Sequence, residues 1–561
     1  MSRYNLVDEY WIPVIVDDKG HSQMVSLLDV FTNGSQYLQL AGDTQTQNFA
    51  VFRLLLAVLQ TALLRYELDG EIREFPDEDW GYEDIDDLEE ELNNTWLEIW
   101  QNESFPKIVV DYLEAWRDRF YLFDDKYPFY QVTASDIDAS KISKKQASSI
   151  SGKNINRMIS ESGNKIALFS PKFAASNNKE ILAEDEIARW LITFQGYTGL
   201  SDKVIFGSEK YKSSKGWLFD IGGLYVEGNN LFESLTLNCI LLHPDEKYRF
   251  NPPKPCWEFE PQARIQRYFE TDSPDNLAEL YTNWSRGIYI DPDIDATKAF
   301  ECQIVKLPDI KHEDQFLEPM TLWRHNDTGP SKNKFTPRKH QANQSIWRSF
   351  GLIALPTYYS DKQRQPGIIA WLNYLTPLIG DRRLTICSVS MADDGNATSW
   401  VPVDELCDQL KIDDFVLTDV QENHWVPRIY DTVETTKRVV GLTFRNFLLD
   451  LKEIRNLATN DFVNERVTEL YYHIDEPFRD WLISIDKDED KDKKVIEWYD
   501  QLACLVRQQV DHLLKQAGPR DYTGIIKNKK DDKDSKILNI AIAHNKFTYY
   551  LNKELKEGRH D

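Results

Sequence analysis

Apolar side chains recur with helical spacing in four long segments of the last third of the chain. These segments lie near residues 428–456, 462–484, 494–516 and 535–556, and hydrophilic links separate them. Residues three and four positions apart share one face of a helix, so each segment predicts an amphipathic helix. Four such helices with short links are typical of an antiparallel four-helix bundle. The stripe of the first segment consists of Val433, Val440, Phe444, Phe447, Leu448 and Leu451.

The pattern before this region is mixed. Helical spacing appears at residues 46–66, 107–121 and 183–195, whereas residues 218–400 alternate short strand-like runs with turns. No regular βαβ alternation is present. The sequence therefore predicts an α+β protein, in which a large mixed N-terminal domain (residues 1–420) precedes a C-terminal four-helix bundle (residues 421–561).

An apolar run, Tyr10 to Val16, lies close to the N-terminus between two pairs of acidic residues. A secretory signal needs a basic start and a longer apolar stretch, so the run is not a targeting signal. Alternating side chains, the turn "DDKG" and a second alternating stretch predict a strand hairpin. Pro13 cannot donate to a ladder, which predicts an edge position for its strand. We expect this hairpin to anchor the N-terminus to the core.

Composition limits the class of protein. A chain of 561 residues with 41% hydrophobic residues has material for two to four globular domains. The longest apolar segment, residues 49–66, contains Arg53 and Gln60 and predicts a buried core helix instead of a membrane span. Six scattered cysteines without a CxxC pair indicate a reducing compartment, and we expect the cytoplasm.

A net charge of −26 argues against a protein that covers nucleic acid with its whole surface, but it leaves room for local basic sites. Two polar stretches carry concentrated lysines. Residues 133–165 predict a long mobile loop, and residues 196–217 form a second loop with four glycines and four lysines. Glycines let backbone N–H groups approach a phosphate, and lysines supply the counter-charge. Nucleic-acid contact and simple solvation remain equal alternatives for these loops.

The sequence offers no strong catalytic constellation. Its ten histidines contain no HxxxH, HExxH or HxH spacing, and no P-loop or GxSxG motif is present. Asp393 and Asp394 could ligate Mg²⁺, but the following Gly395-Asn396 is typical of an ordinary turn. We therefore expect no catalytic residue, cofactor or metal.

Several stretches together resemble one protein family. They are "NLVDEYWIPV" at the N-terminus, "RFYLFDDKYPFYQV" at 119–132, "ARWLITFQ" at 188–195, "YVEGNNLFESLTLN" at 225–238 and "PCWE" at 255–258. In this order and with a helical C-terminal region, the chain resembles the CasA family, the large subunit of the type I-E CRISPR Cascade surveillance complex.

The resemblance implies a non-enzymatic subunit that recognises the protospacer-adjacent motif in double-stranded target DNA and helps to open the duplex. It also implies three groups of partners: the guide RNA-bearing backbone of Cascade, small helical subunits and a recruited helicase-nuclease. Guide pairing would read the remaining sequence. Two alternatives stay open: a metal-dependent nuclease that uses Asp393, Asp394 and a histidine, and a purely architectural subunit.

The resemblance also assigns DNA-binding residues, each with a competing interpretation. The family's glycine-rich loop maps within residues 196–216, and its wedge maps to Gly395-Asn396, where Asn stands for the family's Gln. An ordinary hairpin turn is the alternative at this tip. Met320 occupies the position of the family's minor-groove lysine, which leaves Arg324 as the nearest strong cation. Phe169 follows Lys165 in a loop that contacts nucleic acid in the family, although it could equally be a core residue. The loop candidates are Lys203, Lys212, Ser213, Ser214, Lys215 and Gly216.

Overall fold

The computed structural model describes residues 2–76, 81–161, 180–199, 204–395, 400–527 and 536–557. The chain forms two compact units. The first consists of Met1–Gln341, Lys362–Ile379 and Leu384–Gln409, and the second of Ala342–Asp361, Gly380–Arg383 and Leu410–Asp561. The chain therefore enters the second unit three times, which is more interleaved than the single boundary at residue 420 that the sequence predicts.

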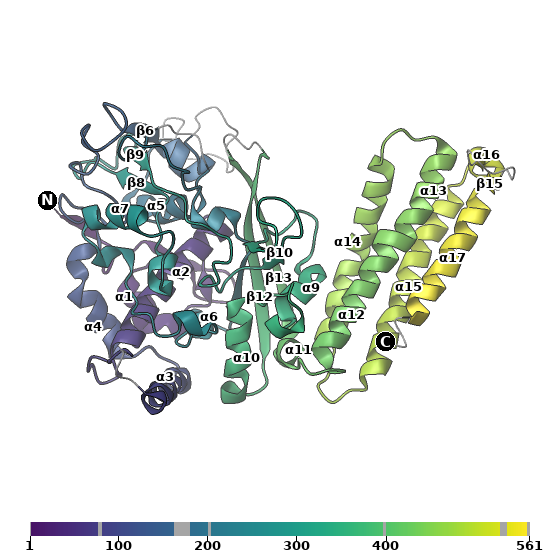
Figure 1. The fold of residues 1–561 in the computed structure, drawn as a ribbon, viewed down its shortest axis with the longest axis horizontal. Coiled ribbons are helices and arrows are strands. Elements are labelled where there is room, and N and C mark those ends of the chain that lie inside the picture. The colour runs from purple at the N-terminus through teal and green to yellow at the C-terminus, as the bar shows by residue number, and fades with distance from the viewer. Residues whose placement is uncertain are drawn as a thin grey trace. The chain divides into compact units, whose positions relative to one another are not determined.

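Helices make up most of the regular structure (Figure 1). The first unit contains α1 (Leu27–Asn33), α2 (Gln45–Arg65), α3 (Tyr82–Asn102), α4 (Lys107–Ala115), α5 (Glu184–Tyr197), α6 (Leu231–Asn238), α7 (Pro261–Glu270), α8 (Leu277–Tyr281) and α10 (Gly367–Ile379). The second contains α9 (Phe350–Ala354), α11 (Phe415–Thr418), α12 (Trp425–Arg438), α13 (Arg445–Arg455), α14 (Asp461–Ile483), α15 (Lys491–Lys515), α16 (Pro519–Thr523) and α17 (Ile540–Glu557).

The strands form small sheets instead of one large sheet. They are β1 (Arg3–Asn5), β2 (Ile12–Ile15), β3 (Ser22–Val25), β4 (Gln39–Leu40), β5 (Tyr121–Phe123), β6 (Ser148–Ser151), β7 (Gly223–Glu227), β8 (Arg286–Tyr289), β9 (Glu301–Lys306), β10 (Trp323–His325), β11 (Phe335–Pro337), β12 (Arg383–Asp393), β13 (Pro402–Asp413), β14 (Ile525–Lys527) and β15 (Lys536–Leu538). Their orders are β3-β2-β4, β6-β9-β8, β13-β12-β7, β1-β5, β10-β11 and β14-β15. Small antiparallel sheets among helices confirm the predicted α+β class.

The N-terminal hairpin exists, but its predicted edge position is wrong. β2 pairs with β3 on one side and with β4 on the other, so β2 is the central strand. Pro13 is tolerated there because β4 has only two residues, and these pair with Val14 and Ile15. The Pro13 carbonyl still accepts a hydrogen bond from the Ala41 N–H at 2.8 Å, so the missing N–H is its only loss.

Helix α2 is the core of the first unit. Thr44 caps its first turn by accepting a hydrogen bond from the Gln47 N–H. Within the described part of the chain, α2 is the one helix long and apolar enough to cross a membrane, and 94% of its apolar window is buried inside the protein. The prediction of a buried core helix is therefore confirmed.

A buried ion pair crosses this core. Arg53 of α2 donates from both terminal nitrogens to the Glu318 carboxylate, each at 2.7 Å, and both side chains are at most 1% exposed. Glu318 also accepts from the Trp217 indole N–H at 2.5 Å and from the Met320 N–H at 2.9 Å. These four donors satisfy a carboxylate that has no access to water.

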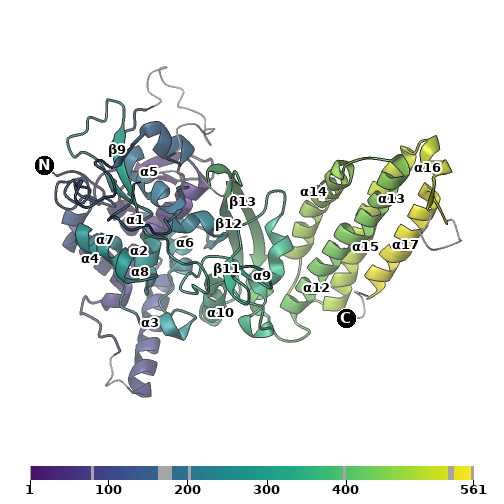
Figure 2. The same ribbon diagram turned by 45° about the horizontal axis from the view of Figure 1, so that its top comes forward.

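The second unit contains the predicted bundle. A π-helical segment, Val439–Phe444, joins α12 and α13 into one long helix, which runs beside α14, α15 and α17 in both views (Figures 1 and 2). The predicted stripe of the first helix is buried throughout, from Val433 to Leu451. The helical periodicity of the sequence thus predicted these four helices correctly.

Trp347 explains why residues 342–361 belong to the bundle unit. Its ring stacks on Phe478 of α14 with centroids 4.1 Å apart, and its indole N–H donates to Asp475 at 2.7 Å. Phe478 in turn contacts Trp498 of α15 edge-on at 4.9 Å. A segment distant in sequence therefore supplies a core residue of the bundle.

The prediction of a long mobile loop at 133–165 is wrong for residues 133–161. Strand β6 lies in this segment and pairs with β9. A π-helical turn, Asn154–Met158, follows and is buried. The Asn154 side chain holds the turn by donating to the Ser160 carbonyl at 2.9 Å and accepting from the Ser151 N–H at 3.2 Å. The few large apolar residues of the segment, among them Ile155 and Met158, are buried, and these side chain to backbone bonds add to that packing.

We expect Arg53→Met to lower the free energy of unfolding of the full chain by about 3–5 kcal/mol, because it leaves the Glu318 carboxylate buried without its cation. Urea denaturation measures this loss. The control is Lys107→Met, which removes an exposed partner of Asp111 and should cost less than about 0.5 kcal/mol. Equal effects of the two changes would contradict the importance of the buried pair.

Candidate nucleic-acid interface

The loop of residues 196–217 is closed at its base by two glycines. Gly216 has a φ of +86°, and a Cβ atom there would lie 2.4 Å from the Gly196 carbonyl oxygen. A side chain at residue 216 would therefore meet both backbone strain and a direct clash. Close packing of the two loop ends requires this glycine, whatever else the loop binds.

The two serines of the loop lie against the protein. Ser213 forms a backbone bridge with Pro308, and the Ser214 N–H donates to the Leu307 carbonyl at 3.0 Å. The Ser214 carbonyl accepts from Arg286 at 2.6 Å, and its hydroxyl accepts from the Gly216 N–H at 3.0 Å. Ser214 is buried. The segment is thus a rigid support, and direct contact of these serines with DNA stays a prediction.

The two described lysine candidates of this loop already have acidic partners. Lys212 is 83% exposed, but its ammonium lies 2.5 Å from Asp309. Lys215 lies 2.6 Å from Asp220 and 4.6 Å from the centre of the Trp400 ring. A phosphate would have to compete with these carboxylates, so each lysine offers less counter-charge than its exposure suggests.

Two neighbouring arginines lie on the β10–β11 hairpin and directly after it. Arg324 pairs with Thr336 in the strand register, and the Arg338 N–H continues the ladder by donating to the Leu322 carbonyl at 2.8 Å. Arg324 and Arg338 are therefore diagonal neighbours on one face of the hairpin. Arg324 is exposed and Arg338 is half-buried. Among the residues that the structure describes, neither guanidinium forms an ion pair.

The electrostatics of Arg338 reflect this missing counter-charge. Partial burial, together with the neighbouring Arg324, lowers the pKa of Arg338. Both influences oppose the charged form, and a bound anion would relieve both. The sequence pointed to Arg324 but missed Arg338. The signal that could have found it is the spacing of cross-strand diagonal neighbours, which becomes readable only once the hairpin register is known.

Two further basic groups follow Arg338. Lys339 lies 2.9 Å from Asp393 and 3.9 Å from Asp220, although burial lowers its pKa. His340 is held by a 2.9 Å hydrogen bond to the Gly223 carbonyl, and burial lowers its pKa as well. The imidazole therefore serves as a neutral donor that joins this segment to β7.

The predicted wedge lies between β12 and β13. Gly395 has a φ of +67°, faces open space and donates its N–H to Asp393 at 2.9 Å. The Asp394 N–H donates to the Val401 carbonyl at 3.0 Å, and the Asp394 carboxylate accepts from the Val401 N–H at 3.2 Å. These bonds define the base of a hairpin tip, and Asn396 itself lies outside the described residues.

Three other candidates, Lys165, Phe169 and Lys203, also lie outside the described residues. Their roles stay predictions. Met320, which stands where the family has its minor-groove lysine, is fully buried beside Glu318. Within the described ranges, no three His, Cys, Asp or Glu side chains are grouped so that they could hold a metal ion.

Known proteins share this fold and sequence pattern. A family model described as CRISPR-associated protein Cse1 matches residues 5–509. A curated relative, the CRISPR-associated protein CasA/Cse1 of Thermus thermophilus, is 26% identical over 269 residues, which are 46% of this chain and 43% of that protein. The aligned part of this chain thus spans less than half the length of this relative.

Solved structures extend the likeness to almost the whole chain. Cse1 of Thermobifida fusca superimposes with a TM-score of 0.75 at 21% identity, over 99% of this chain and 98% of that one. Cse1 from Acidimicrobium ferrooxidans superimposes with a TM-score of 0.69 at 18% identity, over 100% of this chain and 99% of that one. A structure described as a CRISPR RNA-guided surveillance complex contains a chain that superimposes with a TM-score of 0.57 at 15% identity. The match covers 92% of this chain and 100% of that one.

These matches define a class of proteins that combine a mixed α+β unit with a helical bundle. Since the family model covers most of the sequence, the chain belongs to the CRISPR-associated Cse1 family. The resemblance to the CasA family that the sequence motifs indicated is confirmed.

We expect Gly216→Ala to destabilise the full chain more than Gly207→Ala. Both glycines have positive φ, but a Cβ at Gly207 meets nothing within 4 Å. The matched change should therefore cost only the strain of about 1–2 kcal/mol, whereas Gly216→Ala adds the clash with Gly196. Thermal unfolding measures the difference. Equal melting temperatures would show that the loop ends do not need this close contact.

Acidification should destabilise the protein through His340. Its pKa is lowered in the folded state, so the unfolded chain binds the proton first, and stability falls as the pH drops below about 6.5. Urea denaturation at pH 7 and at pH 5.5 measures this loss of stability. His340→Gln keeps a donor for Gly223 and should flatten the dependence, whereas the exposed control His21→Gln should not. An unchanged slope in His340→Gln would refute this role.

Proposed function

We propose that this chain is the non-catalytic large subunit of a type I-E CRISPR RNA-guided surveillance complex. In this proposal it recognises the protospacer-adjacent motif in double-stranded DNA and promotes opening of the duplex. Family membership and the likeness in fold to a chain of a CRISPR RNA-guided surveillance complex support the assignment to such a complex. Recognition of DNA rests on residues of this chain.

The observation that carries the DNA proposal is the pair Arg324 and Arg338. Two guanidiniums share one face of a hairpin in a protein of net charge −26, and neither forms an ion pair among the described residues. A DNA phosphate offers the bidentate acceptors that guanidinium groups fit. Lys212 and Lys215 differ from these arginines because each lysine already forms an ion pair with a nearby carboxylate. The hairpin is therefore the primary backbone contact and the glycine loop a secondary one.

Duplex opening falls to the tip between β12 and β13. Gly395 at positive φ turns the chain, and Asn396 follows as an amide that can hydrogen-bond a base edge. Inserting a side chain between base pairs costs a few kcal/mol of unstacking per step. Phosphate contacts and pairing with the guide offset this cost. Lys165, Phe169 and Lys203 would add contacts in this proposal.

The partners follow from this role. They are the target duplex, the guide RNA-bearing backbone and small helical subunits of the complex, and a helicase-nuclease that docks after opening. The cytoplasm is the expected location. The alternative of a metal-dependent nuclease gains no support from Asp393, whose carboxylate pairs with Lys339 and accepts from the Gly395 N–H. An architectural role would leave the two arginines without a ligand.

We expect the double variant Arg324→Ala/Arg338→Ala to weaken binding of the reconstituted complex to duplex DNA, with or without the motif. Loss of two phosphate contacts should lower the slope of log K against log salt by about two. Fluorescence anisotropy across a salt series measures this slope. Lys107→Ala is the control, since this exposed lysine of α4 is paired with Asp111 and has no role in the proposed contact. An unchanged slope in the double variant would overturn the contact.

We expect Asn396→Ala, and separately the double change Lys203→Ala/Lys210→Ala in the loop of residues 196–217, to abolish motif-dependent opening. The reason is that a methyl group cannot wedge or hydrogen-bond a base edge, and the loop supports the duplex beside it. Fluorescence of 2-aminopurine next to the motif measures opening. A duplex mismatched at these positions is the control and should bind both variants normally. Wild-type opening after both changes would remove this site assignment.

A further inference from the structure

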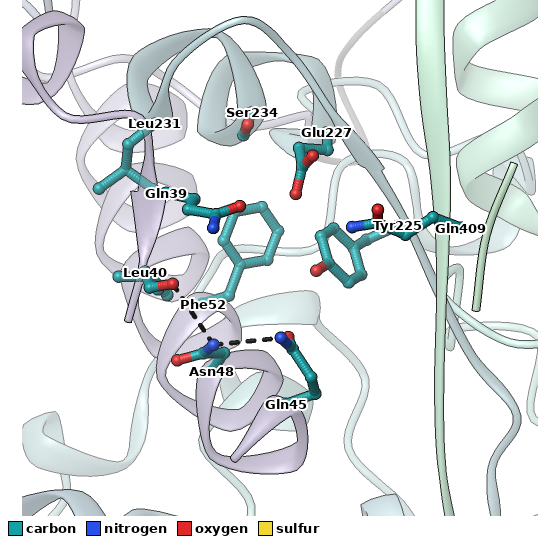
Figure 3. A pocket seen from close by; sticks show the side chains of 10 residues that line it. All are labelled: Gln39, Leu40, Gln45, Asn48, Phe52, Tyr225, Glu227, Leu231, Ser234 and Gln409. Atoms are coloured by element: carbon teal, nitrogen blue, oxygen red, sulfur yellow. Dashed lines mark hydrogen bonds between the residues drawn. The ribbon is translucent and has the colours of Figure 1, made fainter. Parts of the chain in front are cut away.

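The β12–β13 hairpin is held in the core over part of its length. β12 pairs with β7 from Thr385 to Val389. Tyr225 of β7 packs against Phe52 and Phe49 of α2, with ring centroids 5.3 and 5.7 Å apart. Figure 3 shows the Phe52 and Tyr225 rings next to each other, one from α2 and the other from β7. This part of the hairpin is therefore fixed to the core helix of the first unit.

The end of the hairpin that carries the proposed wedge has less support. The ladder between β7 and β12 ends at Val389, whereas β12 continues to Asp393. Met391 is buried, and the Ser390 hydroxyl donates to the Ile221 carbonyl at 3.2 Å. A two-stranded ribbon twists more strongly than a wider sheet and is less stable by itself. The contacts of Asp393, the last residue of β12, therefore bear most directly on the direction of the tip.

Lys339 holds the Asp393 carboxylate. The Lys339 ammonium lies 2.9 Å from Asp393 Oδ2, while Asp393 Oδ1 accepts the Gly395 N–H at 2.9 Å. One carboxylate oxygen thus binds the turn of the hairpin and the other binds a separate segment of the chain. The Lys339 and Asp393 side chains are only 23% and 18% exposed, so water screens this ion pair less than a surface pair.

The backbone on both sides of Lys339 is fixed. The preceding residue, Arg338, donates its N–H to the Leu322 carbonyl at 2.8 Å. The following residue, His340, donates from its imidazole to the Gly223 carbonyl at 2.9 Å. Lys339 therefore extends from a rigid support, and its ammonium can hold a less supported segment in place.

Lys339 also reaches the segment that follows the glycine loop. The Asp220 carboxylate lies 3.9 Å from the Lys339 ammonium and 2.6 Å from that of Lys215. Both ammonium groups lie over the Phe219 ring, at 4.0 Å from its centre for Lys339 and 5.4 Å for Lys215. The charges alternate in sign along the chain of contacts from Lys215 through Asp220 and Lys339 to Asp393. This chain of contacts connects the glycine loop with the base of the wedge.

We propose that Lys339 is a positioning residue of the wedge. Its ammonium ties the base of the tip, through Asp393, to the segment after the glycine loop, through Asp220. This inference rests on the proposed function, which assigns duplex opening to the tip. Base pairs resist insertion, and a tip on a freely twisting ribbon would turn aside instead of separating them. A second residue that locks the base of the tip keeps the inserted side chain in the productive direction.

Direct contact with a DNA phosphate is the competing role for Lys339. Its small exposure and its two carboxylate neighbours disfavour that role. The two roles also differ in what they change. A phosphate ligand contributes to the salt dependence of binding, whereas a positioning residue affects opening and leaves the number of phosphate contacts unchanged.

The first test uses the free full chain without DNA. Lys339→Met keeps most of the apolar stem and removes the charge. Hydrogen exchange, followed by mass spectrometry with residue-resolving fragmentation, should become about fivefold faster at the base of the tip. Lys339→Arg keeps a cation for Asp393 and should restore slow exchange. The amides to follow are those of Asp394, Gly395 and Val401.

A second variant separates the ion pair from the rest of the packing. Asp393→Asn keeps an oxygen that can accept the Gly395 N–H but removes the charge that binds Lys339. Its effect on exchange and that of Lys339→Met should not add in the double variant, because each change breaks the same contact.

The matched control is Lys494→Met in the bundle. Lys494 is also a buried lysine near two carboxylates, 3.6 Å from Glu489 and 3.3 Å from Glu497. Its replacement should leave exchange at Asp394 and Gly395 at the wild-type rate.

The second test uses the reconstituted complex. Lys339→Met should lower motif-dependent opening, measured by 2-aminopurine fluorescence, about tenfold, because a misdirected group loses most of its effect. Binding to a duplex mismatched beside the motif, and the slope of log K against log salt, should stay at wild-type values. Lys339→Arg should recover most of the opening.

Three results would overturn the proposal: wild-type exchange at the base of the tip in Lys339→Met, wild-type opening by that variant, or a reduced salt slope, which would assign Lys339 to a phosphate. Failure of the proposed function looks different. In that case the wild-type complex itself shows no motif-dependent opening, and the role of Lys339 in opening falls with it.

Discussion

The buried pair of Arg53 and Glu318 connects the parts of the first unit on which the proposed DNA contact depends. Glu318 receives hydrogen bonds from α2, from Trp217 directly after Gly216, and from the backbone at Met320, shortly before β10. A carboxylate without water must keep all of these donors. The end of the glycine loop and the start of the arginine hairpin are therefore fixed with respect to one core helix. Preorganisation of the candidate interface is a consequence of charge burial.

This arrangement is compatible with both an acidic protein and the proposed nucleic-acid partner. Most basic side chains near the candidate interface have acidic neighbours, such as Asp309 for Lys212 and Asp393 for Lys339. Local neutralisation suppresses attraction to polyanions over the surface as a whole. Arg324 and Arg338 differ because the hairpin register brings two cations together without a carboxylate among the described residues. In the proposed role, selective binding would depend on where charge is left uncompensated, while the total charge would disfavour non-specific binding to nucleic acid.

The sequence predicted what periodicity encodes and missed what register and packing decide. Helical spacing located the four bundle helices and the core helix α2, because a repeated apolar stripe is a local property. The edge position predicted from Pro13 was wrong because the effect of the missing Pro13 N–H depends on the length of the neighbouring strand β4. The sequence around Pro13 does not show that length. Arg338 was missed because a diagonal neighbour exists only after two strands are aligned. Residues 133–161 seemed mobile because large apolar residues are sparse there, yet Ile155 and Met158 are buried and Asn154 adds hydrogen bonds that composition does not reveal. The identity of the site residues came from a resemblance, and the structure added which of them are free to act.

The interleaved path of the chain has a consequence for how this architecture can evolve. The bundle unit takes its core residue Trp347 from a segment about a hundred residues before the helix that carries Phe478. A genetic exchange that replaced only the C-terminal helices would remove both the ring on which the Trp347 indole stacks and the Asp475 carboxylate that accepts its hydrogen bond. The bundle cannot be shuffled between lineages as a cassette joined at one point. The two units must instead diversify together, and substitutions at residues 342–361 are expected to be tied to substitutions on α14.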